Sequence, residues 1–203
     1  MLKTGCIILA GGKGIRLGQE KAWVELGGVS LLQRAVSNVE FLNSEVIIVK
    51  ATEQELPLVS ARINLRVIHD AVTGKGPLAG IFVGLVNSKY NYNLILACDM
   101  PLVNKDLVKY MRTVAQGYYA VVPRPGSHLE PLQAVYSKNC IFVIENLLSS
   151  DDRSVLDVFD RVRTRYVEST EIKRFDPSYR SFVNINTPAD LIKAEKLLQT
   201  VKR

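Results

Sequence analysis

A glycine-rich segment follows the first apolar run of the chain and carries the residue types that bind phosphate. Ala10 to Gly18 contains four glycines, and glycine lets backbone amides approach phosphate oxygens without a side chain in the way. Arg16 and Lys21 add positive charge beside these glycines, where it could neutralise the charge that builds on a triphosphate as pyrophosphate departs. The segment therefore predicts a phosphate-binding loop, against the alternative that both cations are solvated on a surface turn.

Two familiar phosphate-loop motifs do not fit this segment. A P-loop needs a glycine five residues before Gly-Lys-Ser/Thr, and the dinucleotide motif Gly-x-Gly-x-x-Gly fails because Leu17 stands where its third glycine belongs. The spacing of Gly12, Gly14 and Gly18 does resemble a looser NADP-type pattern. The second apolar run, however, ends at Lys50, without the carboxylate that holds a ribose. An NADP-dependent oxidoreductase is therefore disfavoured.

A carboxylate follows an apolar run in the middle of the chain. Leu94 to Ala97 predicts a buried central strand, and Asp99 lies just past its end. Ligands of open α/β sheets bind beyond the carboxyl ends of the strands, and oxygen atoms are the ligands that Mg²⁺ requires. We expect Asp99 to hold a Mg²⁺ ion that bridges phosphate oxygens. Helix capping or a turn before Pro101 is the local alternative.

Asp70 and two glycines are further candidates. Asp70 follows the predicted strand Leu65 to Ile68, so it could face the same ligand. Gly80 and Gly84 lie four apart in the predicted helix Pro77 to Val86, where each glycine costs about 1 kcal/mol. This cost indicates a compensating role, which is close backbone packing for Gly84 and either packing or room for a base or ribose at Gly80.

Alternating apolar segments predict the elements that position these residues. Continuous apolar runs indicate strands buried on both faces, and apolar residues at helical spacing indicate helices between them. Such alternation predicts an α/β fold: a single-domain, Rossmann-like, mostly parallel sheet with helices on both faces. The predicted strands in this part of the chain are Gly5 to Ala10, Val46 to Val49, Leu65 to Ile68 and Leu94 to Ala97, and the predicted helices are Ser30 to Leu42, Pro77 to Val86 and Leu107 to Val114.

The regular alternation of predicted strands and helices changes beyond Gly117. No linker, repeat or low-complexity segment marks a boundary, so residues 1–203 are expected to form one domain. The expected elements are strands at Ala120 to Val122 and Pro131 to Tyr136, helices at Ile141 to Leu148 and Val155 to Phe159, an edge strand at Val162 to Val167 and a last helix from Pro188 to about Val201.

Composition narrows the class of protein. The net charge is +6, but the 26 lysines and arginines are scattered among acidic residues, which disfavours nucleic acid as a partner and favours small phosphorylated molecules. Because no apolar run approaches the length of a spanning helix and the start lacks a signal-peptide pattern, we expect a cytoplasmic protein that binds no membrane. Cys6, Cys98 and Cys140 are odd in number and widely spaced, which is typical of small buried side chains rather than of disulfides or a zinc site.

Several short motifs follow one another along the chain. They are Leu9-Ala10-Gly11-Gly12 with Arg16, Gly18 and Lys21, then Gly76-Pro77-Leu78-Ala79-Gly80, Cys98-Asp99-Met100-Pro101, Pro131-Leu132-Gln133-Ala134-Val135-Tyr136 and Asn184-Ile185-Asn186-Thr187-Pro188. In these residues and in this order, the motifs resemble the molybdenum cofactor guanylyltransferase family of MobA-like nucleotidyltransferases. Singly, the first loop and the Asp99 segment also occur in other nucleotidyltransferases, so the set is specific only as a whole. The resemblance implies a fold of the nucleotidyltransferase type and Mg²⁺-dependent transfer of GMP from GTP to the terminal phosphate of molybdopterin, with release of pyrophosphate.

The resemblance also implies roles for single residues. Arg16, Lys21 and Asp99 would be catalytic, with Asp99 as the Mg²⁺ ligand, and Asn184 and Asn186 would lie near the acceptor. Molybdenum-insertion proteins and apo-molybdoenzymes are the protein partners that the family implies. The nucleotide contacts would come from Leu9, Ala10, Gly11, Gly12, Lys21, Asp70, Gly80 and Asp99.

Some residues of these motifs have local explanations or depart from the family. Thr187 and Asp190 are left out of the site, because an N-cap threonine, a proline at the first helical position and an acid at the third explain a helix start without a substrate. Arg153 resembles a family arginine, with a surface role as the alternative. Some members carry asparagine after the second strand where this chain has Lys50, so no base or ribose contact is assigned there.

Other functions fit part of the same pattern. A cytidylyltransferase of the same fold, acting on molybdopterin or a small phosphorylated alcohol, is the main alternative. The small residues of the first loop and the late Asn-Ile-Asn-Thr-Pro segment favour guanine over cytosine. A non-catalytic nucleotide-binding module is disfavoured because Arg16, Lys21 and Asp99 are all present.

Overall fold

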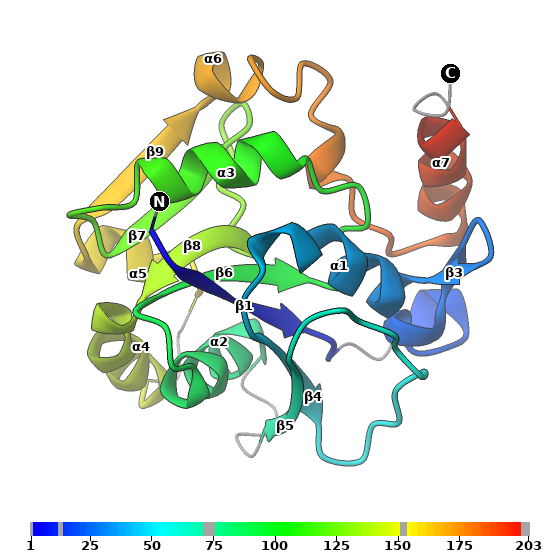
Figure 1. Ribbon diagram of the computed structural model, residues 1–203, viewed down its shortest axis with the longest axis horizontal. Helices are drawn as coiled ribbons and strands as arrows, with labels where there is room; N and C mark the ends of the chain where they lie inside the picture. Colours follow the sequence, from blue (N-terminus) through cyan, green and yellow to red (C-terminus); the bar gives the residue numbers. More distant parts are fainter. Residues whose placement is uncertain (1, 12–13, 71–75, 151–153, 200–203) are drawn as a thin grey trace.

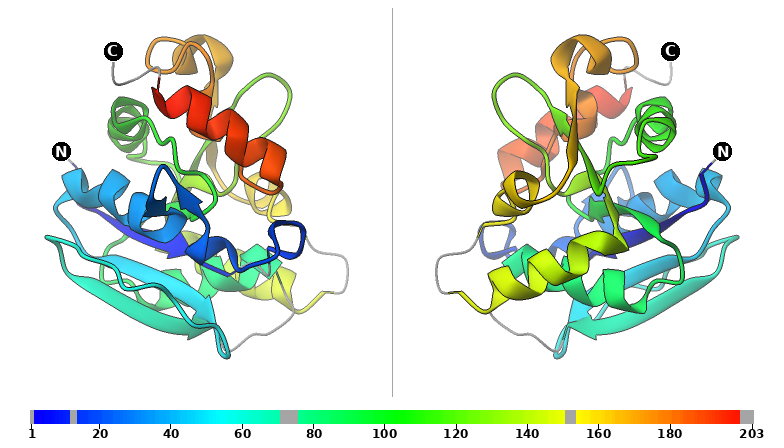
Figure 2. Two further views of the ribbon diagram at one scale, coloured as in Figure 1. Left: turned by 90° about the vertical axis from the view of Figure 1, so that its right-hand side faces the viewer. Right: turned by 90° about the vertical axis from the view of Figure 1, so that its left-hand side faces the viewer.

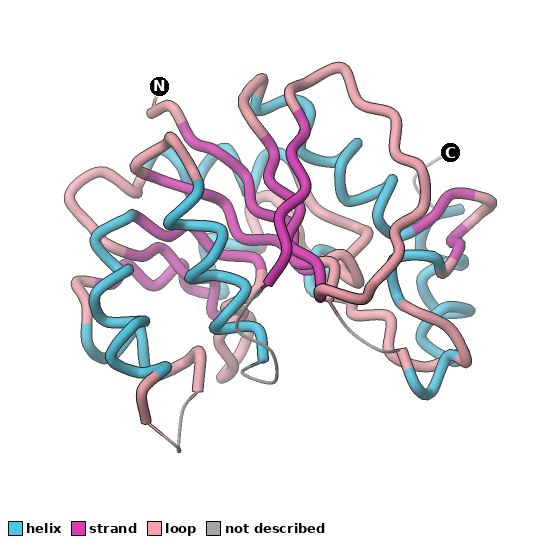
Figure 3. Tube along the Cα trace, turned by 90° about the horizontal axis from the view of Figure 1, so that it is seen from below, coloured by secondary structure: helices cyan, strands magenta, loops and turns pink. Residues whose placement is uncertain are grey.

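Seven strands form the main sheet of the protein in a computed structural model, which describes residues 2–11, 14–70, 76–150 and 154–199. The strand order is β5-β4-β1-β6-β8-β7-β9, and the sheet is twisted (Figure 1, Figure 3). β8 is antiparallel to both of its neighbours and the other pairs are parallel. The predicted mostly parallel sheet is therefore confirmed. The strands are β1 (Thr4–Leu9), β4 (Val46–Ala51), β5 (Leu65–Asp70), β6 (Tyr92–Ala97), β7 (Ala120–Arg124), β8 (Gln133–Ser137) and β9 (Thr164–Glu168).

Helices cover both faces of this sheet (Figure 1). One face packs against α1 (Leu31–Val39) and α3 (Lys105–Thr113), and the other packs against α2 (Gly76–Asn87) and α4 (Ile141–Leu148) with α5 (Asp157–Arg161). Each predicted helix is present, and α4 has the predicted bounds. Within the described part of the chain, no helix is both long and apolar enough to cross a bilayer.

The burial of each strand follows its place in the sheet. All six residues of β1 are buried, as a continuous apolar run in an inner strand requires. β6 is the central strand, and β9 lies at the edge, both as predicted. Asp70 is the last residue of the other edge strand, β5, rather than a residue beyond it, which moves its backbone into the ladder with Ala51 of β4.

Polar side chains fix where the helices begin. The Ser30 hydroxyl accepts a bond from the Gln33 amide at the start of α1, and the Asn104 side chain accepts from two amides at the start of α3. Before α7 (Pro188–Gln199), Asp190 Oδ2 accepts from the Thr187 amide at 2.9 Å and from the Thr187 hydroxyl at 2.8 Å. These bonds hold the pKa of Asp190 below its usual range, beginning with the bond from the Thr187 side chain. The local explanation for Thr187 and Asp190 is confirmed.

A small third cluster, which the sequence did not predict, lies beside the sheet. Two short strands, β2 (Glu25–Leu26) and β3 (Val29–Ser30), form a hairpin next to α7 (Figure 2, left). Val24, Leu26, Leu31, Ile185 and Ala194 are buried together there. The cluster therefore joins the beginning of the chain to its last helix. The remaining short elements are η1 (Ile15–Leu17), η2 (Lys21–Trp23), η3 (Glu40–Leu42), η4 (Lys138–Cys140), η5 (Arg180–Phe182) and α6 (Ser169–Ile172).

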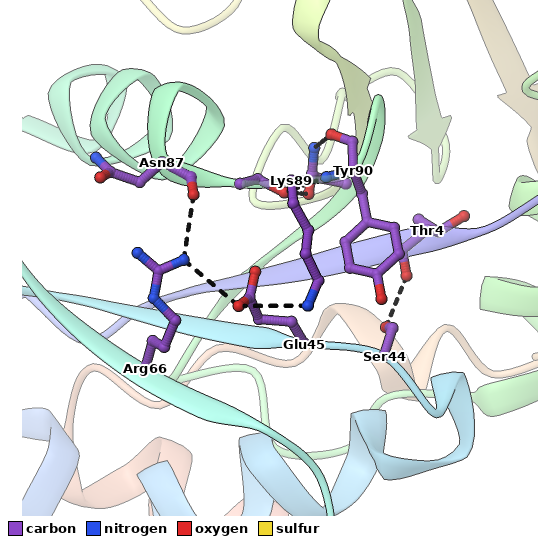
Figure 4. Close-up of polar contacts among 9 residues, drawn as sticks. Thr4, Ser44, Glu45, Arg66, Asn87, Lys89 and Tyr90 are labelled. Carbon is purple, nitrogen blue, oxygen red and sulfur yellow. Dashed lines mark hydrogen bonds and ion pairs between the residues drawn. The ribbon is translucent and has the colours of Figure 1, made fainter.

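A buried carboxylate ties the amino ends of the strands together (Figure 4). Glu45 is 5% exposed, and its Oε1 lies 3.4 Å from Arg66 Nη1 and 3.8 Å from Lys89 Nζ. Arg66 also donates to the carbonyl of Asn87 at the end of α2. The Glu45 backbone carbonyl accepts from the Cys6 amide. These contacts fix the amino edge of the sheet, opposite the edge at which its parallel strands end.

The three cysteines are small buried side chains, as predicted. Cys6, Cys98 and Cys140 are all free and buried. Burial raises the pKa of the Cys98 and Cys140 thiols to about 12 in each case. The thiols are therefore protonated at neutral pH, and the three side chains fill the core.

We predict that Gly84→Ala destabilises the protein. A Cβ atom at this position would lie 2.4 Å from Ile7 Cγ2, and overpacking of this kind costs about 1 to 3 kcal/mol. That cost should exceed the gain of about 1 kcal/mol in helix propensity. Urea unfolding measures the net effect, with Val86→Ala on the exposed side of the same helix as the control. A Gly84→Ala protein as stable as the parent would contradict the packing role.

Candidate functional site

A pocket of about 490 Å³ lies at the carboxyl edge of the sheet, the edge that faces the viewer in the left view of Figure 2. The ends of β1, β4, β5 and β6 line it together with the start of α2. Parallel strands bring their carboxyl ends to one edge, so residues far apart in the sequence meet there. Six of the predicted site residues line this pocket: Leu9, Gly11, Lys21, Asp70, Gly80 and Asp99.

Lys21 and Asp99 form an ion pair in the pocket. Lys21 Nζ lies 2.5 Å from Asp99 Oδ2, and the two side chains are 18% and 14% exposed. The same ammonium group donates to Asn186 Oδ1. Partial burial weakens the screening of such a pair by water. Three predicted residues from three separate segments thus share one polar cluster, which we call the Lys21 cluster.

Backbone and capping bonds hold the Lys21 cluster in place. The Ile185 amide donates to the Asp99 carbonyl at 3.0 Å, and the Ile185 side chain is fully buried in the third cluster. Asp190 Oδ2 accepts from the Asn186 amide at 3.1 Å. The cap of α7 and the buried isoleucine therefore fix where the Asn186 side chain lies.

One oxygen of Asp99 could serve a cation. Asp99 Oδ1 is buried and makes no hydrogen bond with the described residues, and an orphaned carboxylate oxygen is costly unless a ligand satisfies it. Among the described residues, no group of three or more His, Cys, Asp or Glu could hold a metal ion. A single carboxylate fits Mg²⁺ all the same, because this ion keeps several waters and binds through one or two carboxylates together with substrate phosphates.

Glu130 adds further negative charge near Asp99. Burial raises the pKa of the Glu130 carboxyl, and the charge of Asp99 raises it further, while His128 opposes both effects. The sequence analysis did not select Glu130, because a single acid before Pro131 has no motif of its own.

The first loop is braced from the connection between β4 and β5. Ala10 is fully buried, its amide donates to Val49 O at 2.9 Å, and its carbonyl accepts from Gln54 Nε2 at 2.9 Å. Gln54 Oε1 in turn accepts from the Ala51 amide. Both backbone groups of Ala10 are therefore used within the protein, whereas Gly11 is exposed and lines the pocket. Gln54 is a positioning residue that no sequence motif indicated.

The structure explains why two positions of the site are occupied by glycine. Gly14 has φ +47°, and a Cβ atom there would lie 2.0 Å from the Gln19 carbonyl oxygen, so the loop cannot close with another residue. A Cβ atom at Gly80 would lie 3.0 Å from Leu9 Cδ2. Gly80 thus combines tight packing against β1 with a place in the pocket wall.

Some predicted residues lie outside the pocket lining. Arg16 is exposed on η1. Asn184 is half-buried two residues before Asn186 of the Lys21 cluster, and it does not line the pocket. Gly12 and Arg153 lie outside the described residues. Lys50, which the sequence analysis left without a role, does line the pocket. Its position at the end of the second apolar run was visible in the sequence, but neither its place inside β4 nor its place in the pocket wall was.

A glycine loop, a lysine and a carboxylate at the carboxyl edge of a mostly parallel sheet define a phosphate-binding α/β protein. Residues 6–166 match the model of the MobA-like NTP transferase domain. A protein of Pelotomaculum thermopropionicum named "Probable molybdenum cofactor guanylyltransferase" is 39% identical over 98% of this chain and 95% of its own. The molybdenum cofactor guanylyltransferase of Syntrophotalea carbinolica is 33% identical over 92% of this chain and 88% of its own.

Solved structures agree with these sequence matches. The molybdopterin-guanine dinucleotide biosynthesis protein A of Archaeoglobus fulgidus superposes with a TM-score of 0.80 and 26% identity, covering 97% of this chain and all (100%) of that one. The 2-C-methyl-D-erythritol 4-phosphate cytidylyltransferase of Thermus thermophilus shares the fold, with a TM-score of 0.71 and 17% identity, covering 98% of this chain and 100% of that one. The chain belongs to the MobA-like NTP transferase family.

We predict that Gln54→Leu weakens nucleotide binding. The change leaves the buried Ala10 carbonyl without a donor, which costs about 1 to 3 kcal/mol and loosens the start of the loop. Gln33→Leu is the matched control, because Gln33 bonds to Ser60 in the same connection but away from the pocket. Calorimetric titration with GTP should show weaker binding for Gln54→Leu and unchanged binding for Gln33→Leu. Equal affinities for both variants would remove the positioning role.

Proposed function

We propose that this protein transfers GMP from GTP to the terminal phosphate of molybdopterin and so forms the guanine dinucleotide cofactor. The observation that carries the proposal is the Lys21–Asp99 ion pair in the pocket, in a chain whose relatives are named molybdenum cofactor guanylyltransferases. Membership of the MobA-like family supports the reaction type. The reaction is proposed to take place in the cytoplasm, with molybdenum-insertion proteins and apo-molybdoenzymes as partners.

The proposed reaction is an in-line displacement at phosphorus. An oxygen of the acceptor phosphate forms a bond to the α-phosphorus of GTP, the bond to the bridging oxygen of the β-phosphate breaks, and pyrophosphate leaves with the electron pair. Such a step needs little covalent help from the protein. Positioning of the two substrates and neutralisation of phosphate charge supply most of the catalysis.

Lys21 is suited to neutralise that charge. A lysine ammonium carries three N–H donors, and two of them go to Asp99 and Asn186. The third donor is available for a phosphate oxygen bound near Gly11, which lines the same pocket. Arg16, exposed on η1 next to the same loop, is proposed as a second cation for the departing pyrophosphate.

Mg²⁺ is the cofactor that we propose for Asp99. The unpartnered, buried Oδ1 of Asp99 supports this choice, since a carboxylate oxygen is a hard ligand. When bound, the ion would screen the negative charges of the two substrates from one another. Asp99 would hold it, while Lys21 stays paired with the other oxygen of the same carboxylate.

The two substrates would approach from opposite sides of Asp99. The pocket extends from Asp99 towards β4 and β5, where Asp70 and Gly80 lie, so the nucleoside of GTP is proposed to occupy this side together with Leu9 and Gly11. Asn186, which accepts from Lys21 and is not among the residues that line this pocket, is proposed with Asn184 to face the acceptor.

We predict that Asp99→Asn lowers turnover about 100-fold or more, because it keeps the shape of the side chain but removes its charge. Release of pyrophosphate from GTP, Mg²⁺ and molybdopterin measures the effect. Asp106→Asn is the control, because Asp106 is exposed on α3 and its carboxylate pairs with Lys109 on the same helix, away from the pocket. Full turnover in Asp99→Asn, with parental thermal stability, would exclude Asp99 from the proposed role.

Nucleotide choice provides a separate test. A ligand that binds the folded state stabilises it more, at a given concentration, the lower its dissociation constant. At equal concentrations, GTP with Mg²⁺ should therefore raise the melting temperature more than CTP, ATP or UTP. Mass spectrometry of the products should then show molybdopterin enlarged by one GMP. Stronger stabilisation by CTP, with a cytidylyl product, would overturn the choice of guanine.

A further inference from the structure

We propose that Lys50 selects guanine by donating a hydrogen bond to the O6 atom of the base. This inference rests on the proposed function, because it assumes that a nucleotide lies with its phosphates at Lys21 and Asp99. Lys50 lines the same pocket as these two residues, and nothing in the sequence motifs assigns it a role.

The order of the strands places Lys50 about as far from Asp99 as a base lies from the α-phosphate of its nucleotide. Along the carboxyl edge, the end of β4 follows the ends of β6 and β1, so Lys50 lies two strand spacings from Asp99, or about 10 Å. The base and α-phosphate of one nucleoside monophosphate are separated by a comparable length. With the α-phosphate beside Asp99 and the sugar over Leu9 and Gly11, the base reaches the end of β4.

Among the described residues, Lys50 is the cation that lines the β4 end of the pocket. Its Nζ donates to the Gln54 carbonyl, and within the described residues it forms no ion pair. Two N–H donors therefore remain for a ligand. The surrounding wall is mainly apolar, with Val49, Ala51 and Pro77 among its members, which strengthens a hydrogen bond made there.

A lysine ammonium separates guanine from adenine and cytosine by its donors. Guanine presents the acceptors O6 and N7 side by side, whereas adenine and cytosine place an amino donor at the corresponding position. A donor facing an amino group leaves both groups unsatisfied, which costs about 1 to 3 kcal/mol.

The connection that follows β4 keeps Lys50 in position. Gln54, whose carbonyl receives the lysine, is 5% exposed and holds the Ala10 carbonyl. The indole of Trp23, from the turn that carries Lys21, donates to the Glu55 carbonyl at 3.1 Å. The base end and the phosphate end of the pocket are thus joined through one braced segment.

The test compares two nucleotides on one variant, without acceptor or turnover. The affinities of GTP and of 2-aminopurine riboside triphosphate, which keeps the 2-amino group and lacks O6 and the N1 proton, are measured by calorimetric titration with Mg²⁺. The parent protein should prefer GTP by at least tenfold, and Lys50→Met should lower this ratio several-fold by weakening GTP more than the analogue. Because both ligands carry the same charge and meet the same protein, a general loss of folding or of positive charge lowers both affinities and leaves the ratio unchanged.

Lys89→Met, which removes a lysine from the amino edge of the sheet, is the matched control and should keep the tenfold ratio. Equal weakening of both nucleotides by Lys50→Met, or a parent protein without preference for GTP over the analogue, would overturn the role of Lys50. A parent protein that binds CTP better than GTP would instead overturn the proposed function, so the two failures are distinguishable.

Discussion

The ion pair between Lys21 and Asp99 is the interaction on which the pocket depends. It joins the segment after the glycine loop to the end of the central strand, and Asn186 completes it from the last part of the chain. A charged pair that is only partly exposed needs such additional partners, because desolvation offsets much of its attraction. The same three groups that keep the pocket in order are proposed to present charge and oxygen atoms to a bound triphosphate.

The two edges of the sheet have different tasks. At the amino edge, Glu45 is enclosed by Arg66 and Lys89, and the charges there are occupied with one another. At the carboxyl edge, Asp99 Oδ1 and the ammonium of Lys50 keep capacity for further partners. The inner strands β1 and β6 are almost entirely buried and close-packed, so they hold the two edges at a fixed separation. A rigid sheet of this kind suits a protein that positions two anionic substrates.

Much of the fold could be predicted from the sequence, because continuous apolar runs and helical spacing are local signals. The runs before Ala10 and Asp99 predicted β1 and β6, and the bounds of α4 were predicted correctly. The hairpin of β2 and β3 was missed because two-residue strands have no periodicity to detect. Within the site, residue types at strand ends were visible, but the bond from Lys21 to Asn186 spans 165 positions. The burial of Gln54 against Ala10 likewise depends on how the chain returns after β4.

The docking of Ile185 between the hairpin and α7 has a consequence for when activity can arise. Lys21 and Asp99 are synthesised well before Ile185 and Asn186, whose backbone and side chain bond to them. Domains fold as units during synthesis, so the Lys21 cluster is complete only after the segment around Ile185 has been made and has packed. A chain cut before Ile185 is therefore expected to lack the bonds that hold Lys21 and Asp99 in place.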